Sequence, residues 1–177
     1  SDDKAGVATI MALVDTLLHN PQISHGPIAV AFTADEEIGS GIEHFDVAEF
    51  GAKYAYTVDG EVLGGISDET WSARLATVTF RGKSVHPGTA KGVMVNSVYA
   101  FAHFLSHMPQ DMLPETTDGR IGFVHPYFGA ADVEESSVKV LLRDFETPGL
   151  EAKEQIVRGL AADAERAFPG VSVRVDV

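Results

Sequence analysis

The chain has 177 residues, of which 45% are hydrophobic, and this content is enough for a substantial buried core and argues against disorder. It contains no cysteine, so disulfides and thiolate metal sites are excluded and any metal must bind through histidine or carboxylate groups. The net charge of −13 disfavours nucleic acid and anionic membranes as partners, and no run approaches the ~20 apolar residues of a membrane-spanning helix, so we expect a soluble cytoplasmic protein.

The first part of the chain predicts a helix followed by two short apolar strands. Apolar residues recur at helical spacing over residues 5–18. Two apolar runs, at 27–33 and 54–58, end abruptly in acidic residues and are typical of strands covered on both faces. The alternation of strand, helix and strand predicts part of a parallel α/β sheet.

A second unit is expected from about residue 71, because strict apolar and polar alternation begins there. Its order is the ferredoxin-like β-α-β-β-α-β. We therefore predict two domains, 1–70 and 71–177. The predicted elements of the second domain are strands at 73–81, 122–130, 137–145 and 171–177, and helices at 95–107 and 150–168.

Carboxylates follow both predicted strands of the first domain. Glu36 and Glu37 come after the first strand and Asp59 after the second. Ligands of open α/β sheets bind outside the carboxyl ends of the strands, so these groups should converge, and Asp2 should reach the same edge. Gathered carboxylates repel one another unless a cation neutralises them, which favours a divalent metal. Taken singly, each residue is better explained as a helix cap, a solvated loop or a turn residue.

Four short motifs appear in register along the chain. They are Ser1–Gly6 (SDDKAG), Thr33–Gly39 (TADEEIG), Thr57–Gly60 (TVDG) and Ser84–Gly92 (SVHPGTAKG). Together they resemble the M20 family of di-zinc metallopeptidases, and most of all its tripeptide aminopeptidases, over essentially the whole chain. The resemblance implies part of a zinc-peptidase-like α/β catalytic domain followed by a ferredoxin-like lid domain. Complete members carry further segments on both sides, so we expect an internal fragment with exposed apolar faces in its first domain.

The resemblance assigns roles to the acidic residues. Asp2 would bridge two zinc ions, Glu37 would bind one of them and Asp59 the other. Glu36 would be the general base that takes a proton from a metal-bridging water, and the reaction would release the N-terminal residue of a tripeptide. An Asp at position 59, where carboxypeptidase-type relatives carry Glu, agrees with an aminopeptidase. The family's histidine ligands have no counterpart here, so we expect weak zinc binding and little activity from the fragment itself.

Three residues of the second domain also acquire roles from the resemblance. His86 would stabilise the oxyanion of the tetrahedral intermediate. Arg143 would contact the substrate through its carboxylate, with an ion pair to Asp144 or Glu146 as the alternative. Asn96 would contact substrate or cap a helix. The resemblance also allows a homodimer through the lid domain.

Other interpretations compete with a peptidase. A magnesium-dependent phosphoryl-transfer enzyme would use the same aspartates, although no glycine-rich phosphate loop accompanies them. A non-catalytic association module would use the ferredoxin-like unit alone. His103 and His107 have the i, i+4 spacing of helical metal ligands but no glutamate base between them, so we expect surface positions.

Overall fold

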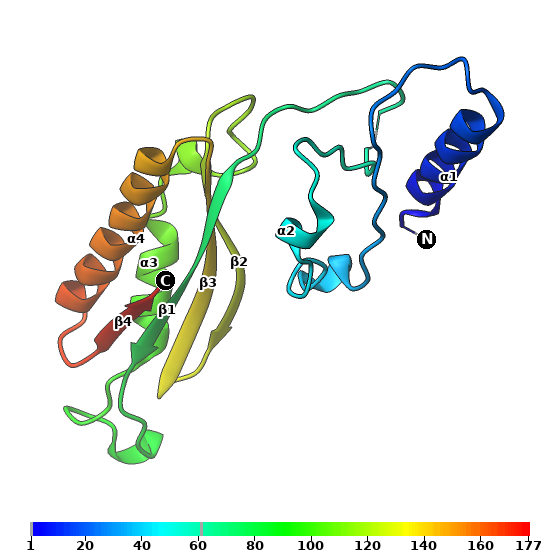
Figure 1. Ribbon diagram of the computed structural model, residues 1–177. Coiled ribbons are helices and arrows are strands. Elements are labelled where there is room, and N and C mark those ends of the chain that lie inside the picture. Colours follow the sequence, from blue (N-terminus) through cyan, green and yellow to red (C-terminus); the bar gives the residue numbers. More distant parts are fainter. Residues whose placement is uncertain (1, 61) are drawn as a thin grey trace. The chain divides into compact units, whose positions relative to one another are not determined.

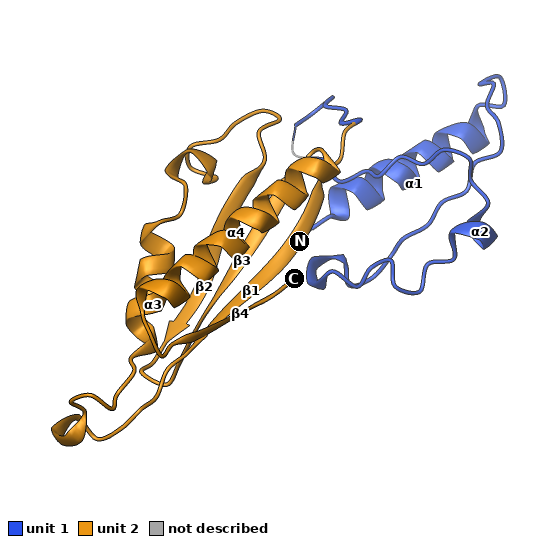
Figure 2. Cartoon of the chain, turned by 90° about the vertical axis from the view of Figure 1, so that its left-hand side faces the viewer, with its two compact units in different colours: residues 1–68 blue, residues 69–177 orange. Residues whose placement is uncertain are grey.

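The computed structural model describes residues 2–60 and 62–177. Ser1, the first residue of the first motif, therefore lies outside the described residues. The chain divides into two compact units, residues 1–68 and 69–177, which Figure 2 shows in different colours. Each unit has its own secondary structure, and they differ in how much apolar surface they bury.

The first unit begins with helix α1, Lys4–His19, which confirms the helix predicted at 5–18. Asp3 caps its start, because the Gly6 backbone N–H donates to Asp3 Oδ1 at 2.9 Å. Asn20 closes its last turn, with Nδ2 donating to the Thr16 carbonyl at 2.8 Å, and Pro21 cannot continue the helix. A 3-10 turn at Glu36–Ile38 and the short helix α2, Val47–Phe50, follow (Figure 1).

The two strands predicted at 27–33 and 54–58 are wrong for this unit, whose described residues contain no strand. The expected parallel sheet is therefore not formed by these segments. A strand exists only where a neighbour satisfies its backbone N–H and C=O groups, and neither segment has such a neighbour in the described part of the chain. The apolar pattern identified segments with strand-like composition, but it could not show whether a neighbouring strand is present to pair with them.

Apolar side chains of the first unit are open to solvent, as the sequence led us to expect. Phe32 is 52% exposed and Tyr56 is 90% exposed. Gly6 is the one residue of this unit that is buried among those the structure describes. Hydrophobic stabilisation scales with buried apolar area, so the first unit gains little of it from its own residues.

The second unit is an α/β unit with one four-stranded antiparallel sheet. The strand order is β2-β3-β1-β4, and each neighbouring pair is antiparallel. The chain order is β-α-β-β-α-β, which confirms the ferredoxin-like arrangement predicted for the second domain. Its elements are β1 (Ser72–Arg81), α3 (Ser97–Ser106), β2 (Phe123–Ala131), β3 (Glu135–Asp144), α4 (Thr147–Ala167) and β4 (Ser172–Asp176), with 3-10 turns at Pro87–Thr89 and Gln110–Met112.

Alternation along the strands directs every second side chain into one core. Val78 of β1 and Val140 of β3 are fully shielded from water and face α3 and α4, which cover the same face of the sheet (Figure 1). Phe104 of α3 packs against Phe80 of β1 with their ring centroids 5.6 Å apart. All the residues of this core belong to the second unit, so this unit carries the apolar burial of the chain.

Helix α4 is amphipathic along its 21 residues. Val157 and Ala161 are buried against the sheet, while Glu154 binds Arg158 of the same helix and Arg74 of β1 at its polar margin. These charged side chains make α4 unlike a membrane-spanning helix. No helix in the described ranges is both long enough and apolar enough to cross a membrane.

Candidate functional site

The predicted metal-bridging residue, Asp2, lies in the turn before α1 and is exposed. The neighbouring Asp3 is half-buried, and its carboxylate is occupied in capping the helix. The capping explanation therefore holds for Asp3, whereas the Asp2 side chain has no such role among the described residues.

The segment that carries Asp59 approaches this same helix start. A Cβ on Gly6 would lie 2.2 Å from the carbonyl oxygen of Val58 and 2.0 Å from Asp3 Oδ2. Since real Cβ atoms do not approach so closely, only glycine fits at position 6. The backbone just before Asp59 is thus packed against the first turn of α1, as convergence of the carboxylates requires. The first motif contains this glycine, but the sequence alone did not indicate its packing role.

Glu36 and Glu37 lie together in the 3-10 turn Glu36–Ile38, and both are exposed. Asp35, directly before them, adopts a positive φ of 62°, which is uncommon for a residue other than glycine and sharpens the bend of the chain here. The Gly39 N–H donates to the Glu36 carbonyl at 2.7 Å and closes the turn.

These acidic residues do not assemble a metal site by themselves. Within the described ranges, no three His, Asp or Glu side chains gather in a way that could hold a metal ion. The donor set is also all carboxylate, whereas zinc in proteins commonly takes nitrogen ligands as well. The residues present therefore do not fit two zinc ions without further ligands.

His86 is exposed and has a defined ring orientation. It precedes the 3-10 turn Pro87–Thr89, and its Nδ1 accepts a hydrogen bond from the Gly88 N–H at 3.1 Å. A nitrogen that accepts cannot carry the proton, so the neutral ring bears its hydrogen on Nε2. Nε2–H is then the ring's remaining donor, and an oxyanion is stabilised by donors of this kind.

Asn96 caps helix α3. Its Oδ1 accepts from the Val98 N–H at 2.9 Å, as the capping alternative predicted. Asn96 also lines a cavity of about 450 Å³ together with Tyr99 and Phe168. Because capping uses the carbonyl oxygen, the Nδ2 amide is the group left to donate to a ligand.

Arg143 forms neither of the ion pairs that we considered for it. Asp144 binds Lys153 of α4, and Glu146 lies 3.7 Å from Arg120. The Arg143 guanidinium instead lies over the ring of Trp71, 4.8 Å from its centroid. The explanation of Arg143 as a structural ion pair is therefore wrong, because its acidic neighbours have other cations as partners.

Asp144 is a well-satisfied carboxylate beside Arg143. Burial raises the pKa of its carboxyl, but the hydrogen bonds from Lys153 and from the Glu146 N–H outweigh this effect, and the pKa lies below its ordinary value. Asp144 therefore stays ionised near neutral pH and is not an acid or base candidate.

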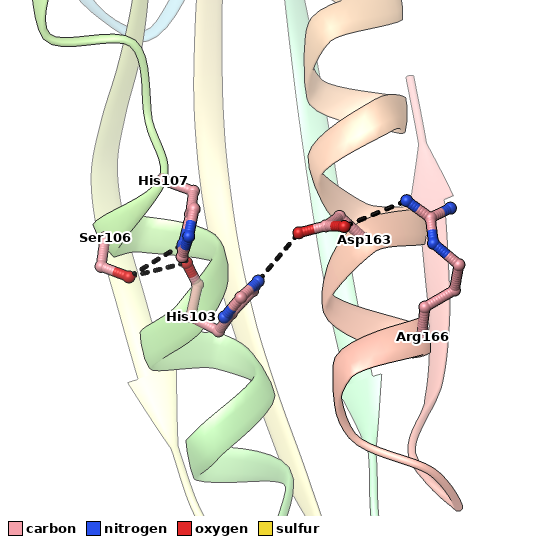
Figure 3. Close-up of polar contacts among 5 residues, drawn as sticks. All are labelled: His103, Ser106, His107, Asp163 and Arg166. Carbon is pink, nitrogen blue, oxygen red and sulfur yellow. Dashed lines mark hydrogen bonds and ion pairs between the residues drawn. The ribbon is translucent and has the colours of Figure 1, made fainter.

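His107 is exposed, as expected, whereas His103 is not a simple surface position. His103 is half-buried, and its Nε2 contacts Asp163 Oδ2 of α4 at 2.9 Å, which joins the two helices (Figure 3). Asp163 also binds Arg166 at 3.0 Å. The two imidazole rings lie 4.0 Å apart, and the His107 Nδ1 contacts the His103 carbonyl at 2.8 Å. The expectation of a surface position was wrong for His103. Its partner Asp163 is 60 residues away in sequence, so the local pattern could not reveal this contact.

Comparison with known proteins identifies the family. Residues 72–171 match the M20 family's domain described as "Peptidase dimerisation domain". The chain is 42% identical to Peptidase T from Geobacillus thermodenitrificans over all of its 177 residues, and 45% identical over 175 residues to Peptidase T from Listeria monocytogenes and from Vibrio cholerae. It covers 43% of each of these proteins, so it spans less than half of their length.

Two solved structures share the fold. Aminopeptidase PepT from Bacillus cereus matches with a TM-score of 0.71 at 24% identity, over 99% of this chain and 48% of that one. A tripeptidase from Staphylococcus aureus matches with a TM-score of 0.77 at 21% identity and the same coverage. At these identities the solved structures support the fold alone, and the assignment to a family rests on the sequence matches. The chain therefore belongs to the M20 peptidase family, and its second unit contains that family's peptidase dimerisation domain.

Proposed function

We propose that this chain is part of a cytoplasmic, zinc-dependent tripeptide aminopeptidase of the peptidase T type. The observation that carries the proposal is the 42–45% identity to Peptidase T over the whole chain, which includes all four motifs. Residues 1–70 would be part of the catalytic domain and residues 71–177 the lid domain. Since the chain spans 43% of those relatives, the activity belongs to a longer protein.

In this proposal the carboxylates of the first unit supply one part of the metal site. Asp2, Glu37 and Asp59 would hold two zinc ions together with nitrogen ligands from other segments of the longer protein. Zinc, when bound, would make a water molecule more acidic. Glu36 would accept and release a proton at its carboxylate, and its exposed position in a tight turn leaves it accessible for this role.

The second unit would recognise the substrate. The Nε2–H of His86, whose Nδ1 accepts from the Gly88 N–H, would donate to the developing oxyanion, and Arg143 would bind the carboxylate of the tripeptide. Asn96 would contribute an amide donor. The defined orientation of His86 supports its role, because oxyanion stabilisation depends on donors that are positioned before the reaction.

The test compares the full-length protein of the parent gene with the 177-residue chain, using trialanine as substrate. We expect zinc-dependent hydrolysis from the full-length protein and little from the chain alone. Glu36→Gln should lower kcat by about 10²–10⁴-fold, while the matched exposed variant Glu43→Gln should leave it unchanged. Equal hydrolysis by Glu36→Gln would reject the assignment of the base. Magnesium-dependent cleavage of a phosphate ester would instead favour phosphoryl transfer.

A second role, self-association, is favoured by the family match of residues 72–171. The strands β2 and β4 are the two edges of the sheet, each paired on one side in the described structure. We propose that the second unit forms a homodimer, which sedimentation at increasing protein concentration would detect. A monomer at all concentrations up to about 100 µM, well above the Kd of a stable dimer, would reject it.

A further inference from the structure

His125 lies on the face of the sheet that the two helices leave uncovered. Val124, the preceding residue of β2, is fully shielded from water beneath the helices, so the side chain of residue 125 points to the other face. Its register partner on β3 is Leu141, which is paired in turn with Leu75 of β1. Leu75 is 44% exposed, so this row of the sheet is accessible to a ligand.

The imidazole ring of His125 is held by two aromatic rings and makes no hydrogen bond to a described residue. Its centroid lies 6.3 Å from that of Phe123, with the rings at 84°, and 5.9 Å from that of Tyr127. The second unit has three other histidines, and each has a ring nitrogen in a hydrogen bond: His86, His103 and His107. Packing therefore positions the His125 ring, while its nitrogens stay available to a ligand.

Two neighbouring rows of the sheet contain one side chain that can accept a hydrogen bond. The rows are Ala73, Arg143 and Phe123, and then Leu75, Leu141 and His125. The Arg143 guanidinium has donors only, and the alanine, leucine and phenylalanine side chains have neither donors nor acceptors. A peptide backbone carries N–H groups as well as carbonyls. His125 is therefore the side chain of these rows that can satisfy a peptide N–H.

The spacing of His125 and Arg143 suits a short peptide. Arg143 is directly opposite Phe123, so His125 is its diagonal neighbour, and the Cα atoms of such neighbours lie about 7–8 Å apart. An extended tripeptide spans about 10 Å. A tripeptide whose carboxylate lies at Arg143 therefore has its C-terminal peptide bond within reach of His125.

We propose that His125 is a substrate-binding residue whose neutral imidazole accepts a hydrogen bond from the N–H of the C-terminal peptide bond of a tripeptide. This bond is not the one that is cleaved, since the proposed reaction releases the N-terminal residue. Leu75 and Leu141 provide an apolar surface beside it. The inference rests on the proposed function for the identity of the substrate and for the role of Arg143.

The test uses the full-length protein of the parent gene with two substrates, trialanine and alanyl-alanyl-lactic acid. In the second compound an ester oxygen replaces the N–H of the C-terminal peptide bond. Release of the N-terminal alanine is measured for both. In the unaltered protein we expect a KM about tenfold higher for the ester, because it cannot donate to His125.

His125→Phe removes the acceptor and keeps a ring between Phe123 and Tyr127. Its KM for trialanine should rise about tenfold while kcat stays within about twofold, because the contact is made equally before and during the reaction. This variant should also no longer distinguish the two substrates, since the group that reads the N–H is gone. His125→Asn should recover part of the preference, because its amide oxygen can accept the same N–H.

His107→Phe is the matched control. It makes the same substitution at an exposed histidine at the end of α3, on the helix side of the sheet. Its KM for each substrate should equal that of the unaltered protein. A rise in KM at both positions would mean that the loss of any histidine ring weakens binding, and it would contradict a specific contact.

Three results would overturn the inference: equal KM values for the two substrates in the unaltered protein, an unchanged KM of His125→Phe for trialanine, or a full preference for trialanine in that variant. The first comparison needs no variant, so it holds even if His125→Phe is unstable. If the unaltered full-length protein releases no alanine from trialanine, the proposed function has failed and the inference fails with it. If trialanine is hydrolysed and one of the three results is found, only the inference has failed.

Discussion

The ion pair between Lys153 of α4 and Asp144 of β3 is largely shielded from water. The two side chains are 12% and 13% exposed, and Asp144 Oδ1 also accepts from the Glu146 N–H at 2.9 Å. In Lys153→Met the carboxylate would keep its burial and lose its counter-ion. Removal of one partner from a buried pair destabilises proteins by about 3–5 kcal/mol, and the residual exposure here lowers our expectation to about 2–3 kcal/mol.

Urea unfolding followed by Trp71 fluorescence measures this change in the unit that contains the pair. With a typical slope for a small domain, the midpoint should fall by about 1–2 M. Arg174→Met is the control, because its partner Asp176 and Arg174 itself are 52% and 75% exposed, and its loss should remain below about 1 kcal/mol. Similar losses in both variants would refute the argument from burial. The double variant Asp144→Asn with Lys153→Met should recover part of the stability.

Three further predictions follow from particular contacts. A Cβ on Gly88 would lie 3.1 Å from His86 Nδ1, so Gly88→Ala should shift the imidazole ¹⁵N resonances of His86, whereas Gly159→Ala, with nothing within 4 Å, should not. Ser97 is fully buried and its Oγ donates to the Asp132 carbonyl at 2.6 Å, so Ser97→Ala should lower the unfolding free energy by about 1–3 kcal/mol, against little change for the exposed Ser106→Ala. The hydrogen bond from His103 holds the pKa of Asp163 below its ordinary value, so this contribution is complete above the unfolded pKa of about 3.9 and is lost as the pH falls through the lower folded value. Denaturant unfolding measured across the acid range should therefore lose less stability in Asp163→Asn than in the unaltered chain, and identical acid sensitivity would contradict this.

The second unit could be predicted from sequence almost element by element, because its signals are local. Strict alternation marks a strand such as β4, and apolar residues at helical spacing mark α3. The boundaries moved by only a few residues, as at β3, where Glu135–Asp144 replaces the predicted 137–145. The strands of the first unit were wrong because composition describes a segment, whereas a strand also needs a partner.

The candidate site divides in the same way. The capping role of Asn96 was predictable, since the cap and the first helical turn are adjacent in sequence. The contact between Trp71 and Arg143 was not predictable. Trp71 directly precedes β1 and Arg143 lies in β3, so the two meet only through the register of these strands. The pairing of His103 with Asp163 likewise depends on how α3 and α4 pack. Contacts between segments that are distant in sequence cannot be predicted from the local pattern of residues.

The two units differ in how far their own residues can hold a functional geometry. In the second unit, the His86 ring is fixed by a backbone donor and Arg143 by two aromatic rings, on a sheet with its own buried core. Such groups are positioned before any ligand arrives, which is what recognition at low entropic cost requires. The carboxylates of the first unit have less support, because its apolar side chains remain exposed, although the Asp3 cap and the close packing at Gly6 order the start of α1. The geometry of the residues proposed for substrate recognition should therefore survive in this chain alone, whereas the geometry of the proposed metal site should depend on the rest of the protein.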